Sequence, residues 1–174
     1  KQERLTTVDA LISVTVPGDG WTCSEDSFHA DATSATWVRC HLTASDPEVW
    51  LMAKDYTVAD EGLQKAPKRL FEDHYDKNYH RMFDSHRYLS QEEVRHQSRP
   101  GFEVLLAANA SGTAIQLRER AVVEGVHVAL VTAHWPEAEG ERVQPAVDSW
   151  FASVRFESLD NPRDMAQAQE RWQL

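Results

Sequence analysis

The chain has 174 residues, of which 41% are hydrophobic and 26% charged, a composition that is typical of a folded domain and excludes a disordered chain. Its formal net charge of -10 disfavours nucleic-acid binding, because that binding rests on Lys and Arg contacts to phosphates. The longest apolar runs, such as residues 128–133, are far shorter than the ~20 residues that a membrane-spanning helix needs. We therefore expect one water-facing domain over residues 1–157 and a helical tail over residues 158–174.

The first third of the chain alternates apolar and polar residues, which predicts β-strands. Residues 11–16 form the first of these strands, and Pro17 begins the turn that ends it. Residues 49–58 are apolar on both faces near their middle, where Trp50 to Ala53 follow one another. This pattern indicates a central strand that is covered on both sides.

Residues 21–25 and 35–43 are predicted to form the two arms of a hairpin that encloses a polar loop. Side-chain parity favours the pairing in which Cys23 lies opposite Cys40. The arms should then bury one apolar face together.

Residues 66–83 change to the period of a helix, with Pro67 tolerated in the first turn. The apolar face of this helix consists of Phe71, Tyr75, Tyr79 and Met82. We expect these four side chains to be buried and the charged face to be solvated.

The pattern returns to strands from residue 86 onward. These four strands are predicted at residues 86–96, 102–108, 113–123 and 126–135. Short connections at 109–112 and 124–125 supply residues that tolerate positive φ, which favours an antiparallel meander. Glu119 has the same parity as its apolar neighbours Ile115 and Leu117, so we expect a β-bulge or an exposed strand end there.

A second helical stripe follows Pro136. Its apolar residues are Val143, Val147, Trp150, Phe151 and Val154. Burying them contributes on the order of 10 kcal/mol of gross transfer free energy, so this helix should lie on the sheet. A last short helix is expected after a cap at Asn161. The whole pattern predicts an α+β domain with an antiparallel sheet of about six to seven strands flanked by helices.

Two stretches of the sequence resemble the Mog1/PsbP-like superfamily, which includes bacterial envelope lipoproteins. Residues 12–21, ISVTVPGDGW, are similar to its strand followed by a proline and a Gly-Trp pair. Residues 146–156, AVDSWFASVRF, are similar to its closing amphipathic helix. The resemblance spans about residues 8–157.

The resemblance implies an α/β/α sandwich and a role as a binding or assembly subunit, and it carries over no catalytic residue. It also implies a periplasmic, secreted or otherwise envelope-associated location, with the cytoplasm as the alternative. Because the chain begins at Lys1, we expect a processed or trimmed product. Its precursor is compatible with a lipid anchor.

Cys23 and Cys40 are the two cysteines of the chain, and their spacing is not that of a metal site. One interpretation is a pair of small buried thiols. The other is a cross-strand disulfide in an oxidising compartment, which stabilises by ~3 kcal/mol for a loop of this length.

Carboxylate and imidazole side chains recur every four residues along the first helix, at Glu72, Asp76, His80 and Asp84. Such side chains on one side of a helix can bind a divalent transition metal. An ordinary solvated charged face is the commoner explanation of this pattern. We keep Asp76, His80 and Glu72 as weak metal-ligand candidates.

Two of the six tryptophans are candidates for a binding surface. Trp37 has the opposite parity to Val38 and Cys40, so it faces either solvent or a second helical layer. Trp172 lies in the C-terminal tail. Exposed tryptophans often anchor protein partners.

Phosphate loops, dinucleotide fingerprints and zinc-protease motifs are absent from the sequence, so we predict no catalytic residue and no cofactor. The first functional hypothesis is a non-catalytic binding or assembly module of the bacterial envelope that recognises a protein partner. The alternative is a small-molecule or metal-binding protein, enzymes included. Its pocket would lie between the long helix and the sheet, near Trp50, Phe71, Tyr75 and Tyr79.

Overall fold

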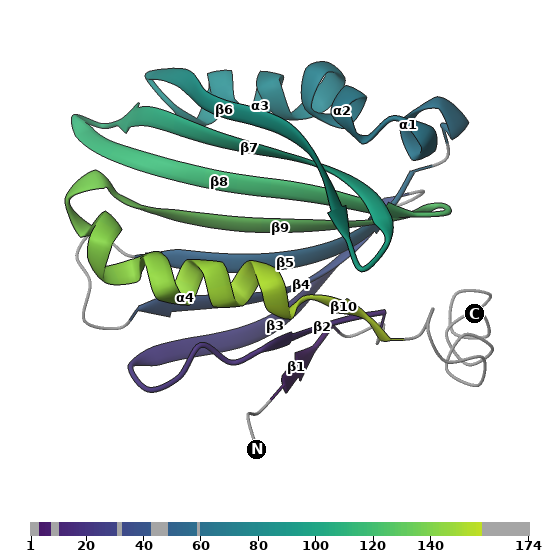
Figure 1. Ribbon diagram of the computed structural model, residues 1–174, viewed down its shortest axis with the longest axis horizontal. Coiled ribbons are helices and arrows are strands. Elements are labelled where there is room, and N and C mark those ends of the chain that lie inside the picture. The colour runs from purple at the N-terminus through teal and green to yellow at the C-terminus, as the bar shows by residue number, and fades with distance from the viewer. Residues whose placement is uncertain (1–3, 8–10, 31–32, 43–48, 59, 158–174) are drawn as a thin grey trace.

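The computed structural model describes residues 4–7, 11–30, 33–42, 49–58 and 60–157, and it confirms the expected α+β fold (Figure 1). The larger sheet is antiparallel, with the spatial order β3-β4-β5-β9-β8-β7-β6. The bounds of its strands are β3 Trp21–Ala30, β4 Thr33–Leu42, β5 Trp50–Thr57, β6 Ser85–His96, β7 Arg99–Ala110, β8 Thr113–Glu124 and β9 His127–Pro136. The predicted helical tail and Trp172 lie outside the described residues.

A smaller sheet joins the two ends of the domain. Its order is β1-β2-β10, and its strands are β1 Arg4–Thr6, β2 Ile12–Thr15 and β10 Arg155–Phe156. Both neighbours run antiparallel to β2. The first and last described segments of the chain therefore lie on either side of β2.

One face of the larger sheet is covered by α4, Gly140–Ser153, which follows the short 3-10 helix η2, Glu137–Glu139. The apolar stripe predicted for this helix is buried against β2, β5 and β9. The indole Nε1 of Trp150 donates a hydrogen bond to the carbonyl oxygen of Met52 at 3.1 Å. This contact fixes α4 across the middle of the sheet.

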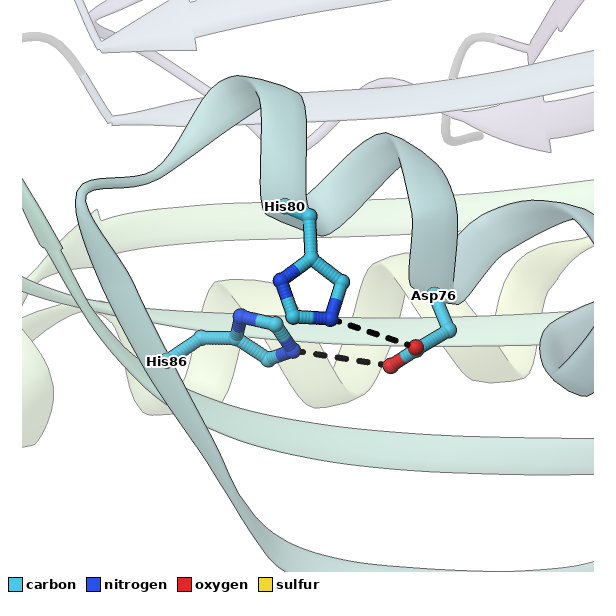
Figure 2. Close-up of side chains that lie close together, drawn as sticks. All are labelled: Asp76, His80 and His86. Atoms are coloured by element: carbon cyan, nitrogen blue, oxygen red, sulfur yellow. Dashed lines mark ion pairs between the residues drawn. The ribbon is translucent and has the colours of Figure 1, made fainter.

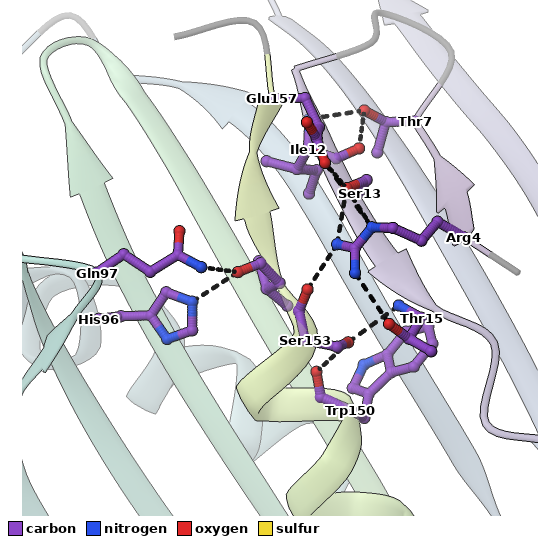
Figure 3. A network of polar contacts seen from close by, with 11 residues as sticks. Arg4, Thr7, Ile12, Ser13, Thr15, His96, Gln97, Trp150, Ser153 and Glu157 are labelled. Atoms are coloured by element: carbon purple, nitrogen blue, oxygen red, sulfur yellow. Dashed lines mark hydrogen bonds and ion pairs between the residues drawn. The ribbon is translucent and has the colours of Figure 1, made fainter. Parts of the chain in front are cut away.

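Side chains from three segments meet in a polar network at the end of α4 (Figure 3). The guanidinium of Arg4 donates to the hydroxyls of Ser13 and Thr15 and to the carbonyl oxygen of Ser153. From the β6 side, the His96 ring contacts the carbonyl oxygen of Val154 at 2.7 Å. These bonds hold together the small sheet, the end of α4 and the turn after β6.

The other face of the larger sheet carries the remaining helices, α1 Glu61–Lys65, α2 Pro67–Leu70 and α3 Asp76–Met82, with a π-helical turn, η1 Phe71–Tyr75, between α2 and α3. The helical segment begins before the predicted residue 66, because Asp60 caps α1 through bonds to the amides of Gly62 and Leu63. Among the described residues, no helix is long and apolar enough to cross a membrane.

Three of the four residues predicted for the buried stripe, Phe71, Tyr75 and Tyr79, are buried as expected. Met82 is not, since it is 58% exposed. A π turn takes up more residues than an α turn, so the residues after it are rotated relative to a regular stripe. Met82 is also the last residue of α3.

The predicted pairing of the first hairpin is confirmed, with Cys23 opposite Cys40 in the ladder of β3 and β4. Both strands are longer than predicted, because pairing continues through residues 26–30 and 33–34, which the sequence analysis assigned to a polar loop. In the structure the two cysteines form a disulfide. This bond joins β3, at one edge of the larger sheet, to the neighbouring strand β4.

Glu119 does not lie at a bulge or at an exposed strand end, so that prediction was wrong. It sits in an unbroken register between β7 and β9 and is 7% exposed. The ladder irregularity lies instead in β6, between Tyr88 and Ser90. Burial is tolerated because the hydroxyls of Tyr79 and Thr132 donate to the two carboxyl oxygens.

Removing the disulfide should lower the stability of the fold without changing it. The double substitution Cys23→Ala and Cys40→Ala is expected to reduce the free energy of unfolding by about 3 kcal/mol, because the unfolded chain regains the freedom of the open loop. Urea titration measures this loss. A reducing agent should destabilise the wild type and leave the double variant unchanged. Two alkylated thiols in unreduced native protein, detected by mass spectrometry, would show that the bond is not formed.

Candidate functional site

A hollow of about 530 Å³ lies between the helices and the larger sheet. Its helical wall is formed by Tyr75, Asn78, Tyr79 and Met82. Its floor comes from the strands in the middle of the sheet, β5, β9 and β8. The hollow therefore occupies the place that the sequence analysis proposed for a pocket, and Trp50, Tyr75 and Tyr79 line it as expected. Phe71 is buried and lies outside its lining.

The strand register arranges the floor in rows. Trp50 pairs with His134 and Met52 pairs with Thr132 across β5 and β9. The second row continues into β8, where Thr132 pairs with Glu119. Because side chains alternate between faces along each strand, these partners point to the same side of the sheet, the side on which α3 lies.

The buried carboxyl of Glu119 is the main polar group under the hollow. The phenol of Tyr79 donates to its Oε1, and the hydroxyl of Thr132 donates to its Oε2 at 2.7 Å. Burial raises the pKa of Glu119, while the two hydrogen bonds act in the opposite direction. The same burial raises the pKa of Tyr79, so its phenol stays protonated and remains a donor.

A histidine and a lysine also line the hollow. Burial lowers the pKa of His134 to about 4, so its imidazole is neutral at physiological pH. Burial also lowers the pKa of Lys54, against which the nearby Glu119 carboxylate acts. The lining of the hollow is thus largely apolar, and its polar groups include one carboxyl group, one amine, the guanidinium of Arg39 and one neutral imidazole.

Next to the hollow, the same face of the sheet is less covered on β4 and β5. Trp37, His41 and Trp50 are half-buried there, and Arg39 is exposed. The guanidinium of Arg39 lies 4.4 Å from the ring centroid of Trp50, and the rings of His41 and Trp50 are 4.9 Å apart. We call these four residues the β4–β5 patch.

The structure places Trp37, one of the two predicted binding-surface candidates, in this patch. It pairs across the strands with Lys54, which lines the hollow. Parity allowed either a solvent-facing indole or an indole covered by a helix. Trp37 is half-buried, so its exposure is intermediate between these two alternatives.

The weak metal-ligand candidates separate into two groups. Asp76 and His80 lie close together, with 3.5 Å between Oδ2 and Nε2. Glu72 pairs instead with Lys68, one helical turn earlier. The third neighbour of Asp76 is His86, from the start of β6, whose Nε2 is 3.5 Å from Oδ1 of Asp76 (Figure 2).

Sequence reasoning missed His86, Glu119, Lys54 and His134 as site residues. The parity of Glu119 with Ile115 and Leu117 was a usable signal, because it put a carboxyl among buried side chains. No such signal existed for His86. Its approach to Asp76 depends on how sharply the chain reverses between α3 and β6.

Known proteins that share this fold are found by comparing structures and not by comparing sequences. No protein-family model and no curated protein matches the chain in sequence. The solution structure of cyanobacterial PsbP from Synechocystis sp. PCC 6803 matches with a TM-score of 0.61 at 7% identity, covering 88% of this chain and 91% of that one. The Ran-binding protein Mog1p of Saccharomyces cerevisiae matches with a TM-score of 0.52 at 11% identity, covering 90% and 95%.

The chain has a Mog1/PsbP-like fold. The resemblance seen in residues 12–21 and 146–156 is thereby confirmed at the level of fold. In this fold the first stretch supplies β2 and the second supplies most of α4 and all of β10. Both stretches belong to the core between the small sheet and α4, away from the hollow.

The pH dependence of stability should reveal the buried carboxyl of Glu119. Because burial raises its pKa, the folded protein holds this proton more tightly than the unfolded chain. The resulting stabilisation is complete below the unfolded pKa and is lost as the pH rises through the folded pKa. Glu119→Gln removes this dependence and can still bond to both Tyr79 and Thr132. We expect E119Q to be more stable than the wild type at about pH 8, by roughly 1 kcal/mol or more, with a smaller difference at about pH 5.

Urea unfolding at the two pH values measures this difference. The matched control is Glu92→Gln, because Glu92 is exposed on β6. E92Q should follow the wild type at both pH values. If E119Q were the less stable protein at about pH 8, burial would not be the dominant influence on Glu119.

Proposed function

We propose that the protein is a non-catalytic binding module of the bacterial envelope, which recognises a protein partner through the β4–β5 patch and the adjoining hollow. The observation that carries this proposal is the patch itself. It presents half-exposed tryptophans and an exposed arginine beside an apolar recess. Tryptophan and arginine are the residues that most often dominate binding energy at protein interfaces.

The patch is held in shape before any partner arrives. Arg39 stacks over Trp50, and His41 packs against the same indole. Strand pairing fixes the spacing of these side chains, because Arg39 lies opposite Met52 and His41 opposite Trp50. An ordered surface loses less conformational entropy on binding, which favours affinity.

The charge of the patch indicates the chemistry of the partner. Arg39 and Lys54 place two basic groups on this face of a chain whose formal net charge is -10. An acidic side chain next to an apolar one would suit both the guanidinium and the recess. We therefore propose an acidic and apolar segment of a protein as the occupant.

Two further findings support a protein-binding role in the envelope. The Cys23–Cys40 disulfide is of a kind that persists in oxidising compartments such as the periplasm and the cell surface. Yeast Mog1p is named as a Ran-binding protein, so the fold is compatible with protein recognition.

The hydroxyls of Tyr79 and Thr132 both donate to Glu119, which occupies them in holding the helix on the sheet.

Site-specific photo-crosslinking in the native host tests the proposal. A benzophenone amino acid at position 37 should capture one reproducible protein. The same residue at position 149, on the exposed side of α4, should not. Arg39→Glu should weaken the capture by about tenfold or more, because it puts a like charge against an acidic partner. Failure of position 37 to capture any protein reproducibly would contradict the proposal.

The hollow also supports the second candidate function, the binding of a small molecule. Its volume of about 530 Å³ falls within the range of ligand pockets, and a few polar groups converge on a mostly apolar lining. A small ligand would contact Met52 on the floor, and Asn78 and Met82 on the helical wall.

A thermal-shift screen separates the two functions. A ligand present at about 100 times its dissociation constant should stabilise the protein by ~2.7 kcal/mol. Met52→Trp fills the floor of the hollow and should abolish the shift. Ser149→Trp, which adds the same indole to the exposed side of α4, should keep it. Hits that are insensitive to M52W would place the ligand elsewhere.

A further inference from the structure

Three potential metal ligands converge on the side of α3 that faces β6. They are Asp76 and His80, one turn apart on the helix, and His86 on the strand (Figure 2). Their ligand atoms all lie within 4.8 Å of one another. We propose that Asp76, His80 and His86 bind a divalent transition-metal ion, with Zn²⁺ as the representative ion.

The spacing of the cluster fits such an ion. Zinc lies about 2.0–2.2 Å from imidazole nitrogen and carboxylate oxygen, so neighbouring ligand atoms in a tetrahedral site are roughly 3.3 Å apart. Nε2 of His80 lies 3.5 Å from Oδ2 of Asp76 and Nε2 of His86 lies 3.5 Å from Oδ1, so each carboxylate oxygen faces one imidazole at close to this separation. The two imidazole rings lie edge to face with their centroids 4.8 Å apart, and the 70% exposed side chain of His80 has room on its solvent side to turn toward the ion.

The other two ligands are held in place. The His86 side chain is 7% exposed, and its ring packs edge-on against Tyr79 and Tyr88, with both centroids 5.8 Å away. The hydroxyl of Tyr88 donates to Oδ1 of Asp76, which orients the carboxylate. Such outer contacts are what metal ligands usually have.

The types of ligand decide which metals suit the site. Two imidazoles and one carboxylate favour zinc and its transition-metal neighbours over Ca²⁺ or Mg²⁺, which prefer oxygen ligands throughout. A simple surface ion pair between Asp76 and His80 would be worth little. It would also give no reason for a nearly buried His86 to face the same carboxylate from another element. Three protein ligands leave one position of a tetrahedral zinc ion for water or for a ligand atom of another molecule.

Isothermal titration of chelator-treated, full-length protein with ZnCl₂ tests the proposal. The wild type should give a one-to-one isotherm. His80→Ala removes a ligand from an exposed position and should weaken the affinity by at least about tenfold, as should Asp76→Asn. Tyr88→Phe keeps all three ligands and should weaken it by roughly tenfold through loss of carboxylate orientation.

The matched control is His74→Ala, because His74 is exposed on the same helical segment and is not part of the cluster. H74A should bind like the wild type. At the same concentration, zinc should raise the melting temperature of the wild type and H74A by more than that of H80A, whose melting temperature without zinc shows that it is folded. Absence of heat with the wild type would overturn the proposal, and so would equal binding by H80A and the wild type.

Discussion

The placement of α3 depends on one buried hydrogen bond, from the phenol of Tyr79 to the carboxyl of Glu119. A carboxyl group below a helix costs free energy unless it is bonded, so the pair constrains where α3 can rest. Thr132 donates to the second carboxyl oxygen and ties the pair to the next strand. The helix is therefore held on the sheet by a polar contact as well as by apolar burial.

The two faces of the larger sheet are covered differently, and this difference creates the site. On one side α4 buries a continuous apolar stripe against the sheet and against β2. On the other side the apolar core lies under α1 to α3 and over β7 and β8. Around β4 and β5 that same side keeps half-buried aromatic residues, Trp37 and Trp50 among them. The β4–β5 patch is what remains where the helices leave the sheet less covered.

The strands and the closing helix could be predicted from periodicity. Where one face is buried, apolar residues recur every 2 positions along a strand and about every 3.6 positions along a helix. Parity favoured the pairing of Cys23 with Cys40, since a shift by one residue would have turned the apolar residues of one of the two strands outward. The resemblance in residues 12–21 and 146–156 also pointed to the correct fold, because those residues build its core.

The candidate site was less predictable, because it depends on contacts between distant segments. Periodicity treats a carboxyl group on an apolar face as an exception, and Glu119 was accordingly predicted to lie at a bulge or at an exposed strand end. The approach of Tyr79, forty residues earlier, and of Thr132 on the next strand explains its burial. The prediction that Met82 is buried failed for a local reason. The π turn at Phe71–Tyr75 breaks the regular helical repeat on which an apolar stripe depends. His86 joined Asp76 through a chain reversal that no spacing rule describes.

The hollow and the Asp76, His80 and His86 cluster share α3, which links them physically. Tyr75, Asn78 and Met82 line the hollow, whereas Asp76 and His80 face β6, and Tyr79 lies between the two sides. An ion held between α3 and β6 stabilises the same helix position that gives the hollow its wall. Linkage then requires that any partner or ligand which needs this wall binds more tightly when the ion is present, and that the ion binds more tightly in the complex. The anchoring of Tyr79 on Glu119 limits the size of this effect, because a helix that is already fixed has little freedom left to lose.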